Sequence, residues 1–574
     1  MSGLTIFGLI ALLSVFLVGL QGLREQKKQR AIAEKLITGE YGGTPMENRG
    51  RDEAAVEGSY LHARKDFFLD DITWNDLDME LVFRRMNYAR CSAGAEELYR
   101  MLRCPVMEEE ILRQRDMLAD CMMERSALRG QLSMAFYEIG FTGKYALEDY
   151  LDYLDDLGQR SNAKHILMDL VYVPAIALLF VNPGIGIALL FLVLVINIMT
   201  YFKEKGEANP YLVSFAYILR MIRGAEKVKG ILDKACRDGS IKTGAPGIEE
   251  IFVKYRGVLE KDIKELGSFK NFSQVAISMS NPAGGSGPFD ILFDYLKMAL
   301  HLDLMKFNQM LKVVRQKDAC VRELVSAVGT LDACICIAYF RASLESFCRP
   351  DFGKKRGVSA KELYHPLLEH PVKNSIDTEK GVLITGSNAS GKSTFLKTVA
   401  LGAVLAQTVC TVPAKSFSAP FYRVMSSMAL RDDLIGGESY FMVEIRALKR
   451  VLDAGGEKYP VLCFVDEVLR GTNTVERIAA SSRILQSLTG DEIFCFAATH
   501  DIELTHLLED YYENYHFEET IEDGDISFNY LLKKGRAQSR NAIRLLEVMG
   551  YDKQVVREAE MLAERFLATG EWKA

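Results

Sequence analysis

Two uncharged apolar blocks stand out along the chain. The first runs from Gly3 to Gly22, which as a helix spans about 30 Å, the thickness of a membrane's hydrocarbon core. Basic residues follow at once over 24–30, so this end is expected on the cytoplasmic side. A cleaved signal peptide would need positive charge before the apolar run and a small-residue cleavage site after it, and the sequence has neither. We therefore expect an uncleaved anchor.

The second block runs from Leu170 to Phe202 and is interrupted by Asn182-Pro183-Gly184, a strong turn signal. It predicts a helical hairpin of roughly His165–Val181 and Ile185–Phe202. Asp169 lies near the start of the first arm, so a shallow or re-entrant first arm is an alternative to a full crossing. A buried pair of soluble helices is the alternative, although an uncharged run of this length is long for one. Basic residues flank the hairpin on both sides, which favours a cytoplasmic location for both of its ends.

Helical periodicity dominates the sequence on either side of the hairpin. Apolar positions recur three and four residues apart from about Phe67 to Gly140, and again from about Tyr211 to Phe347. The expected divisions are a transmembrane anchor over 1–23, a polar, Gly-rich linker over 24–60, a helical region over 61–164, the transmembrane hairpin over 165–202, a second helical region over 203–350, and an α/β domain over 351–574.

The pattern changes after Pro350, where short β-branched runs alternate with helical stretches. This alternation is typical of a parallel sheet and predicts strands at Gly381–Thr385, Pro460–Val465 and Glu492–Ala497. Polar residues gather where each run ends. Because ligands bind at the carboxyl ends of strands in open α/β sheets, we expect the functional site at that edge.

A phosphate-binding loop follows the first of these strands. The segment has the pattern Gly-x-x-x-x-Gly-Lys-Ser between a strand and a helix, in which the glycines let backbone N–H groups face phosphate oxygens and the helix adds its positive end. Lys392 is expected to reach the β- and γ-phosphates, and Ser393 to bind Mg²⁺. The expected nucleotide-binding residues of the loop are Gly386, Ser387, Asn388, Ala389, Ser390, Gly391, Lys392, Ser393 and Thr394.

Two other strand ends carry groups suited to hydrolysis. Asp466 and Glu467 end the second strand, and we expect Asp466 to hold Mg²⁺ with Ser393 and Glu467 to act as the general base for an attacking water. His500 follows the third strand, where it would sense the γ-phosphate or polarise the water; a hydrogen-bonded core histidine is the alternative. ATP and Mg²⁺ are the expected cofactors.

A Gly pair followed by Ser439 precedes an amphipathic helix between the loop and Asp466. Such a helix start can hydrogen-bond a phosphate, including one bound to a second subunit, and an ordinary helix cap is the alternative.

Composition excludes some classes of function. The net charge of −7, from 70 basic and 77 acidic residues, argues against a strongly basic nucleic-acid coat protein but leaves a local basic face open. The 11 cysteines include no Cys-x-x-Cys pair, so a zinc site is not expected. Reduced, buried cysteines are typical of a cytosolic protein.

Taken in order, the C-terminal motifs resemble the ATPase domain of the MutS family of DNA mismatch-repair proteins. The similar stretch runs from about Leu331 to Ala563 and includes HPLL, ITGSNASGKSTFLK, DDLIGGESYFMVE, FVDEVLRGTNT and AATHDIELTHL. Residues Leu69–Met117 are more weakly similar to the family's core and lever region. The resemblance implies an ATP hydrolase: an α/β P-loop NTPase domain with an ABC/MutS-like parallel sheet, preceded by a mainly α-helical core and lever region, here carrying transmembrane helices.

The resemblance also implies roles for single residues. Ser439 matches the signature serine that reaches the γ-phosphate of a partner subunit, which implies composite sites in a dimer, most simply a homodimer. Arg470–Thr474 matches the loop that links the two sites. His365 and Asn374 lie near the matched pocket for the nucleotide base. The C-terminal helices around Asn541–Phe566 are implied to help the dimer form.

Some positions depart from the family pattern. Tyr440 stands where Thr is usual and Leu469 where Gly is usual, but neither supplies an indispensable group. The chain before the hairpin is too short for the mismatch-reading domain and connector as well as the core, and it has no clear Phe-x-Glu wedge. The sequence therefore predicts a membrane-anchored MutS-like ATPase that lacks the mismatch-reading domain, with its ATPase domain facing the cytoplasm.

Two functions remain open. One is a DNA-binding ATPase related to mismatch repair or recombination; here DNA is expected from the resemblance, because no basic stripe stands out. The other is a membrane ATPase that drives a protein or membrane event without DNA. A non-enzymatic scaffold would need an incomplete site, but Lys392, Ser393, Asp466 and Glu467 are all present.

Overall fold

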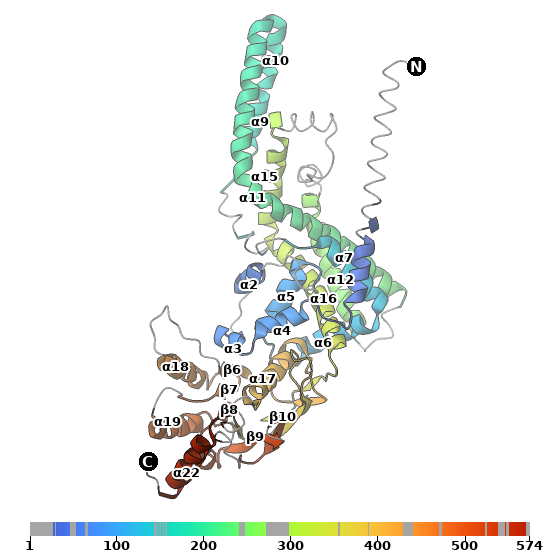
Figure 1. Ribbon diagram of the computed structural model, residues 1–574. Helices are drawn as coiled ribbons and strands as arrows, with labels where there is room; N and C mark the ends of the chain where they lie inside the picture. Colours follow the sequence, from blue (N-terminus) through green and yellow to red (C-terminus); the bar gives the residue numbers. More distant parts are fainter. Residues whose placement is uncertain are drawn as a thin grey trace. The chain divides into compact units, whose positions relative to one another are not determined.

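The structure, a computed structural model, divides into two compact units (Figure 1). The first comprises Met1–Arg64, Met86–Arg100 and Met117–Ser343, and the second Lys65–Arg85, Met101–Asp116 and Leu344–Ala574. The residues that the structure describes are 24, 27–28, 30–45, 53–62, 67–142, 146, 149, 151–152, 154, 158–239, 247–270, 298–353, 356–387, 390–428, 440–469, 473–522, 525–537, 543, 546 and 550–569. The expected anchor at 3–22 lies outside them.

The described part of the first unit is helical, and its core surrounds α16 (Asp318–Ser343). Gly329 lets α16 approach the start of α5, because a Cβ there would lie 2.5 Å from the carbonyl oxygen of Ala93. The buried Asp332 carboxylate accepts hydrogen bonds from the N–H groups of Arg90 and Cys91 at 2.9 and 3.1 Å. Other helices wholly in this unit are α2 (Glu53–His62), α7 (Ser126–Ile139), α12 (Ile248–Glu265) and α15 (Leu302–Gln316). Three helices cross the division between the units: α4 (Met79–Met86), α5 (Ser92–Arg103) and α6 (Glu109–Glu124).

The second apolar block forms a helical hairpin (Figure 1). At its turn the Asn182 side chain accepts a hydrogen bond from the N–H of Ile185 at 3.3 Å, and Pro183 occupies the first helical turn, where a missing N–H is tolerated. Gly186 lets the arms approach, because a Cβ there would lie 2.7 Å from the backbone nitrogen of Leu179. The helices of the hairpin are α9 (Ala163–Leu170), α10 (Tyr172–Val181) and α11 (Pro183–Arg237).

The second arm is longer than the sequence predicts. It does not end at Phe202, because α11 continues as one helix of 55 residues to Arg237. The polar residues after the apolar block are compatible with a helix, and the helix then regains a buried face through Phe215, Ile218 and Ile222.

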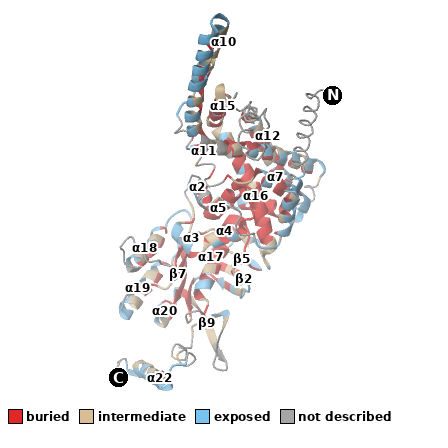
Figure 2. Cartoon of the chain, turned by 45° about the horizontal axis from the view of Figure 1, so that its top comes forward, coloured by how far each residue is buried: buried red, intermediate tan, exposed pale blue. Residues whose placement is uncertain are grey.

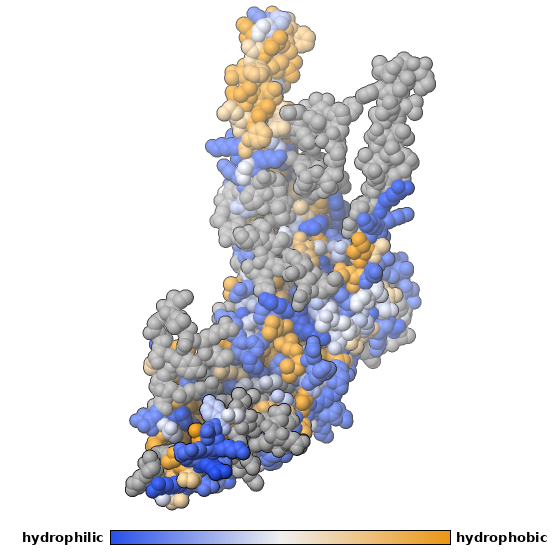
Figure 3. Space-filling view, viewed as in Figure 1, coloured by the Kyte–Doolittle hydropathy of each residue, from blue (hydrophilic) through white to orange (hydrophobic). Residues whose placement is uncertain are grey.

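The hairpin is apolar and largely exposed (Figures 2 and 3). Phe180 and Val181 beside the turn are 88% and 81% exposed. Among the described residues, three helical segments are long and apolar enough to cross a membrane: Ala163–Val181, Pro183–Ala208 and α16. The first two are only 11% and 22% buried, whereas α16 is 83% buried in the core of its unit. Insertion of the hairpin in a membrane stays a prediction.

The base of the hairpin differs from its tip because it holds buried polar groups. The ring nitrogens Nδ1 of His165 and His301 lie 3.2 Å apart, and Nε2 of His301 lies 2.8 Å from the carbonyl oxygen of Asn197. The Tyr201 hydroxyl donates to the carboxylate of Asp303 at 2.5 Å. These contacts join both arms to the start of α15.

A six-stranded sheet forms the centre of the second unit, in the order β10-β9-β4-β8-β7-β6. The strands from β9 to β6 are parallel, and β10 is antiparallel to β9. The strands predicted at Gly381–Thr385, Pro460–Val465 and Glu492–Ala497 are confirmed as β4, β7 and β8. The strand bounds are β4 (Gly381–Thr385), β6 (Arg423–Ser427), β7 (Val461–Asp466), β8 (Ile493–Thr499), β9 (Tyr512–Glu522) and β10 (Asp525–Lys534).

A smaller sheet and several helices complete this unit. The four-stranded sheet has the order β1-β5-β2-β3. Its strands are β1 (Pro350–Asp351), β2 (Val358–Leu363), β3 (Asn374–Thr378) and β5 (Ser416–Ser418). The helices are α3 (Asp71–Asp76), α17 (Lys392–Val409), α18 (Tyr440–Asp453), α19 (Thr474–Ser487), α20 (Ile502–Leu507) and α22 (Lys553–Thr569).

A segment from the N-terminal helical region packs on this sheet. The carboxylate of Asp76 accepts hydrogen bonds from the Ser426 hydroxyl at 2.6 Å and the Met428 N–H at 2.9 Å. The Thr73 hydroxyl accepts from the Ser426 N–H at 3.1 Å. Helix α3 therefore packs at the β6 edge, although its helical periodicity alone assigns it to the helical region over 61–164.

Candidate nucleotide-binding site

The phosphate loop connects β4 to α17, as the sequence predicts. Gly386 and Gly391 have φ angles of +150° and +104°, in the region that favours glycine. A Cβ on Gly386 would lie 2.8 Å from the Ser390 hydroxyl and 3.0 Å from the carbonyl oxygen of Phe517. Only glycine fits there without displacing a neighbour, so the two loop glycines are required by geometry.

Lys392 lies at the first position of α17 with its ammonium turned into the loop. Its Nζ donates to the carbonyl oxygens of Gly386 and Ser387, both at 2.8 Å, and lies 3.4 Å from Nε2 of His500. The residue is 5% exposed. A buried cation in contact with neutral backbone carbonyls is poised to attract a phosphate.

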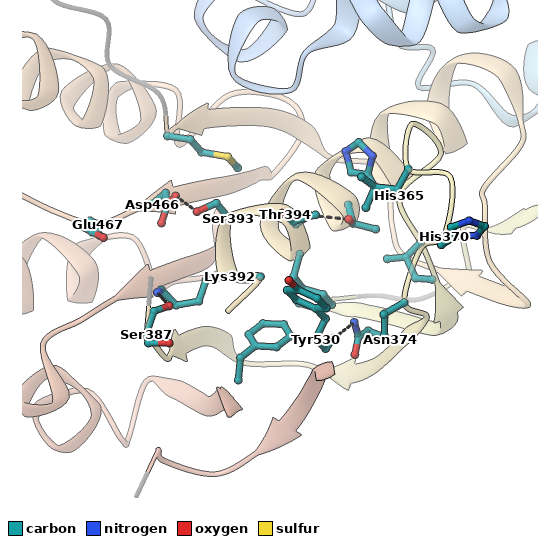
Figure 4. Close-up of a pocket in the computed structure, with 18 of the residues that line it drawn as sticks. His365, His370, Asn374, Ser387, Lys392, Ser393, Thr394, Asp466, Glu467 and Tyr530 are labelled. Carbon is teal, nitrogen blue, oxygen red and sulfur yellow. Dashed lines mark hydrogen bonds between the residues drawn. The ribbon is translucent and has the colours of Figure 1, made fainter. Parts of the chain in front are cut away.

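Ser393 and Asp466 meet although 73 positions separate them in the chain. The Ser393 hydroxyl donates to Oδ2 of Asp466 at 2.5 Å (Figure 4). A hydroxyl and a carboxylate are hard oxygen ligands, which suit Mg²⁺. Among the described residues no group of three His, Cys, Asp or Glu side chains is placed to hold a metal. Mg²⁺ is commonly bound by one or two protein ligands together with substrate phosphates, and the chemistry of this pair fits that arrangement.

Glu467 and His500 form a second pair at the same edge. Nε2 of His500 lies 2.8 Å from Oε1 of Glu467. Glu467 has φ of +58° and Leu469 has φ of +60°, a left-handed conformation that costs a non-glycine residue about 1–2 kcal/mol. The turn after β7 is thus strained, and it directs the Glu467 carboxylate toward the site.

One cavity of about 910 Å³ brings these groups together. It contains predicted phosphate-loop residues, both acidic residues, His500, and the predicted base-pocket residues His365 and Asn374. The predicted site residues that line it are His365, Asn374, Ser387, Gly391, Lys392, Ser393, Thr394, Asp466, Glu467 and His500. Their roles stay predictions.

His365 is a neutral group in the wall of this cavity. Burial, with a smaller contribution from the nearby Lys397 ammonium, lowers the pKa of His365 to about 4, and Asp78 opposes the shift. Its Nδ1 accepts a hydrogen bond from the N–H of Leu367 at 3.3 Å. The imidazole is therefore uncharged at neutral pH and offers an apolar ring face and one N–H.

Tyr530 is a lining residue that the sequence reasoning missed. Its ring lies within the cavity near the phosphate loop (Figure 4), and a Cβ on Gly391 would lie 3.2 Å from it. The pairing of β10 with β9 is interrupted between Phe528 and Leu532, and Tyr530 has φ of +54° there. Asn374 holds this bulge: it donates to the Tyr530 carbonyl at 3.0 Å and accepts from the Leu532 N–H at 2.8 Å. Asn374 thus positions the ring. In the sequence Tyr530 is the aromatic residue of YLLKKG, and this segment matches no motif whose spacing would identify Tyr530 as a site residue.

Several predicted site residues lie outside the described residues. These are Asn388 and Ala389 of the phosphate loop, Ser439 before α18, and Arg470–Thr472 after the turn. Asn473, which follows them, caps α19 by accepting a hydrogen bond from the N–H of Val475 at 3.0 Å.

The carboxyl edge of the parallel strands brings together a glycine-rich loop, a lysine, a hydroxyl–carboxylate pair and a second acidic residue. This combination defines a P-loop nucleotide-binding domain. Residues 382–567 match the family described as MutS domain V, which is an α/β ATPase domain. The matched range contains most of the cavity described above.

Comparisons with individual proteins agree. The chain is 32% identical over 262 residues to the DNA mismatch repair protein MutS of Thermus thermophilus, covering 45% of this chain and 32% of that protein. It is 31% identical over 283 residues to MutS of Lactobacillus delbrueckii subsp. bulgaricus, covering 47% and 33%. It is 33% identical over 276 residues to DNA mismatch repair protein MutS 2 of Haloarcula marismortui, covering 42% and 29%. The chain spans about a third of the length of these relatives. The likeness to MutS proteins covers less than half of this chain, and the match to MutS domain V covers residues 382–567.

Proposed function

We propose that this chain is a membrane-anchored MutS-like ATPase that binds and hydrolyses ATP at sites completed in a homodimer, and that it acts on DNA. The observation that carries the proposal is the convergence of Lys392, Ser393, Asp466, Glu467 and His500 on one cavity at the carboxyl edge of the sheet. Each step of ATP hydrolysis then has a group of suitable chemistry.

Lys392 would exchange its carbonyl contacts for the β- and γ-phosphates. Ser393 and Asp466 would hold Mg²⁺, which when bound neutralises phosphate charge. Glu467 would orient the attacking water and accept its proton, and His500 would hold the Glu467 carboxylate in place through their contact at 2.8 Å.

The other end of the cavity suits the nucleotide base. Tyr530 offers an aromatic face, and His365 is a neutral ring that adds no charge beside the base. Asn374 would act by holding the bulge that carries Tyr530. Asn374 also lines the cavity, so this positioning role would add to the contact with the base that its place near the matched pocket predicts.

The dimer and DNA parts of the proposal rest on the family. Ser439 is proposed to complete the partner's site, and the C-terminal helices to help the dimer form. DNA is proposed because the similar proteins are named as DNA mismatch repair proteins. The net charge of −7 gives no independent support for DNA.

The membrane part of the proposal is supported by the exposed hairpin. Its tip is apolar and its base holds the buried His165–His301 and Tyr201–Asp303 contacts, a polarity expected if the tip enters lipid and the base stays near the interface. With the anchor at 3–22, both attachments would leave the ATPase domain in the cytoplasm.

The test is steady-state ATP hydrolysis by the detergent-purified protein, alone and with homoduplex, mismatched or branched DNA. We expect hydrolysis that depends on Mg²⁺, changes with DNA, and is abolished in Lys392→Ala. Normal hydrolysis by Lys392→Ala would refute the assignment of the phosphate loop.

The second candidate function is a membrane ATPase that drives a protein or membrane event without DNA. The exposed apolar hairpin is the observation that favours it. Robust hydrolysis that no DNA alters would support this alternative over the DNA-acting one.

A further inference from the structure

We propose that Glu444 of α18 is a positioning residue for the general base, acting through the backbone N–H of Leu469 to hold the turn that directs Glu467. The inference rests on the proposed ATPase function and deepens it, because it names a residue outside the cavity that sets the rate of the same reaction.

Glu444 occupies a core position of an amphipathic helix. Ala447, Leu448 and Val451, at spacings of three, four and seven from it, are all buried, and Glu444 itself is 2% exposed. An acidic side chain rarely takes such a position unless a hydrogen bond compensates its burial. Its Oε1 accepts a hydrogen bond from the N–H of Leu469. The carboxylate is therefore placed for this contact rather than for solvent.

The turn that receives this hydrogen bond is held at each of its three residues. The N–H of Glu467 donates to the carbonyl oxygen of Ala498 at 2.9 Å, and the carbonyl oxygen of Val468 accepts from the Ser481 hydroxyl at 3.2 Å. Glu444 supplies the third contact, at Leu469. Two of the three turn residues are left-handed, a conformation that persists only where surrounding contacts enforce it.

The conformation of this turn decides where the Glu467 carboxylate lies. Its Oε1 is 2.8 Å from Nε2 of His500, so a tilt of the turn would change that contact and the distance from the carboxylate to an attacking water. Glu444 does not line the cavity as the described residues define it. Loss of Glu444 should therefore slow the chemical step without weakening ATP binding.

Helix α18 also connects the turn at Glu467–Leu469 to more distant parts of the unit. The Arg450 guanidinium, near the other end of α18, donates to the carbonyl oxygen of Ser426 on β6 at 2.5 Å and pairs with Asp70. Because α18 begins at Tyr440, Glu444 lies about one helical turn from its start. A displacement of that helix start would reach the catalytic turn through Glu444.

The experiment measures kcat and KM for ATP in the full-length protein in detergent. We expect Glu444→Ala to lower kcat about 10- to 100-fold while KM stays within about twofold. Glu444→Gln keeps the acceptor oxygen and should restore kcat to near the wild-type value. Lys449→Ala, an exposed position on the same helix, is the matched control and should behave as wild type.

Wild-type kcat in Glu444→Ala would overturn the inference, as would a rise in KM that accounts for the whole loss of activity. If Glu444→Ala does not fold, as judged by its melting temperature and ATP affinity, Glu444→Met fills the site without an acceptor and must show the same loss of kcat. A wild-type protein that hydrolyses no ATP would instead refute the proposed function itself. The two failures are thus distinguishable.

Discussion

Nε2 of His500 lies 2.8 Å from Oε1 of Glu467, at the ends of two neighbouring parallel strands. The same Nε2 lies 3.4 Å from Nζ of Lys392. The histidine therefore connects the residue expected to activate water with the residue expected to bind phosphate.

Replacing Glu467 with Gln should separate ATP binding from hydrolysis. The amide keeps the size and one hydrogen-bond acceptor but loses the base, so hydrolysis should fall by about 100-fold or more while ATP stays bound. The ATP-bound dimer should then accumulate, as size-exclusion chromatography with light scattering would detect. A monomer–dimer balance that ATP leaves unchanged in this variant would contradict both the dimer and the role of Glu467.

Tyr530→Ala should weaken ATP binding. Stacking of a base on an aromatic ring contributes about 1–3 kcal/mol, so KM should rise by about tenfold with kcat little changed. Tyr530→Phe keeps the ring and serves as the control. Equal KM values for Tyr530→Ala and wild type would place the base elsewhere.

The buried His365 should make stability depend on pH. Its folded pKa of about 4 lies below the unfolded value of about 6.5, so between these pH values the unfolded chain takes up a proton that the folded chain does not. Because only the unfolded chain binds this proton, the free energy of unfolding decreases as pH falls from about 7 to 4. The contribution of His365 to this decrease is at most about 3 kcal/mol. Thermal unfolding of His365→Gln should show a weaker loss of stability over this range than wild type. Parallel curves for the two proteins would show that the histidine is not buried in this way.

Leu469 should tolerate Gly better than Ala. Both substitutions remove a buried side chain, a loss of about 2–5 kcal/mol, but only Gly relieves the left-handed backbone at φ of +60°. The Gly variant should therefore unfold at a higher denaturant concentration than the Ala variant, by about 1 kcal/mol of free energy. The reverse order would mean that the turn is not left-handed in solution.

Removing Gly3–Gly22 together with the His165–Phe202 hairpin should release the protein from membranes. The reason is that the hairpin carries apolar side chains such as Phe180 and Phe191 that are 88% and 68% exposed. Membrane flotation of the intact and deleted chains measures this. An intact chain that remains in the soluble fraction would contradict the membrane prediction.

The sequence by itself determined the features that depend on neighbouring residues. The phosphate loop, the acidic end of β7, the three buried strands and the turn at Asn182-Pro183 all follow from local pattern, since each needs only a few consecutive side chains and a fixed backbone geometry. The resemblance to the MutS family, rather than local pattern, marks Leu469 as a departure from the usual Gly, and its positive φ gives a physical reason for glycine at that position.

Only the tertiary structure decided which distant residues meet. Tyr530 enters the cavity because a bulge in β10 turns it there, and Asp76 covers β6 from 350 positions away. Helix α11 runs past its apolar block because a second buried face continues it, and Glu444 reaches Leu469 because α18 packs on the core. These outcomes depend on packing between residues far apart in the chain, and hydrophobic periodicity and motif spacing describe only residues close in sequence.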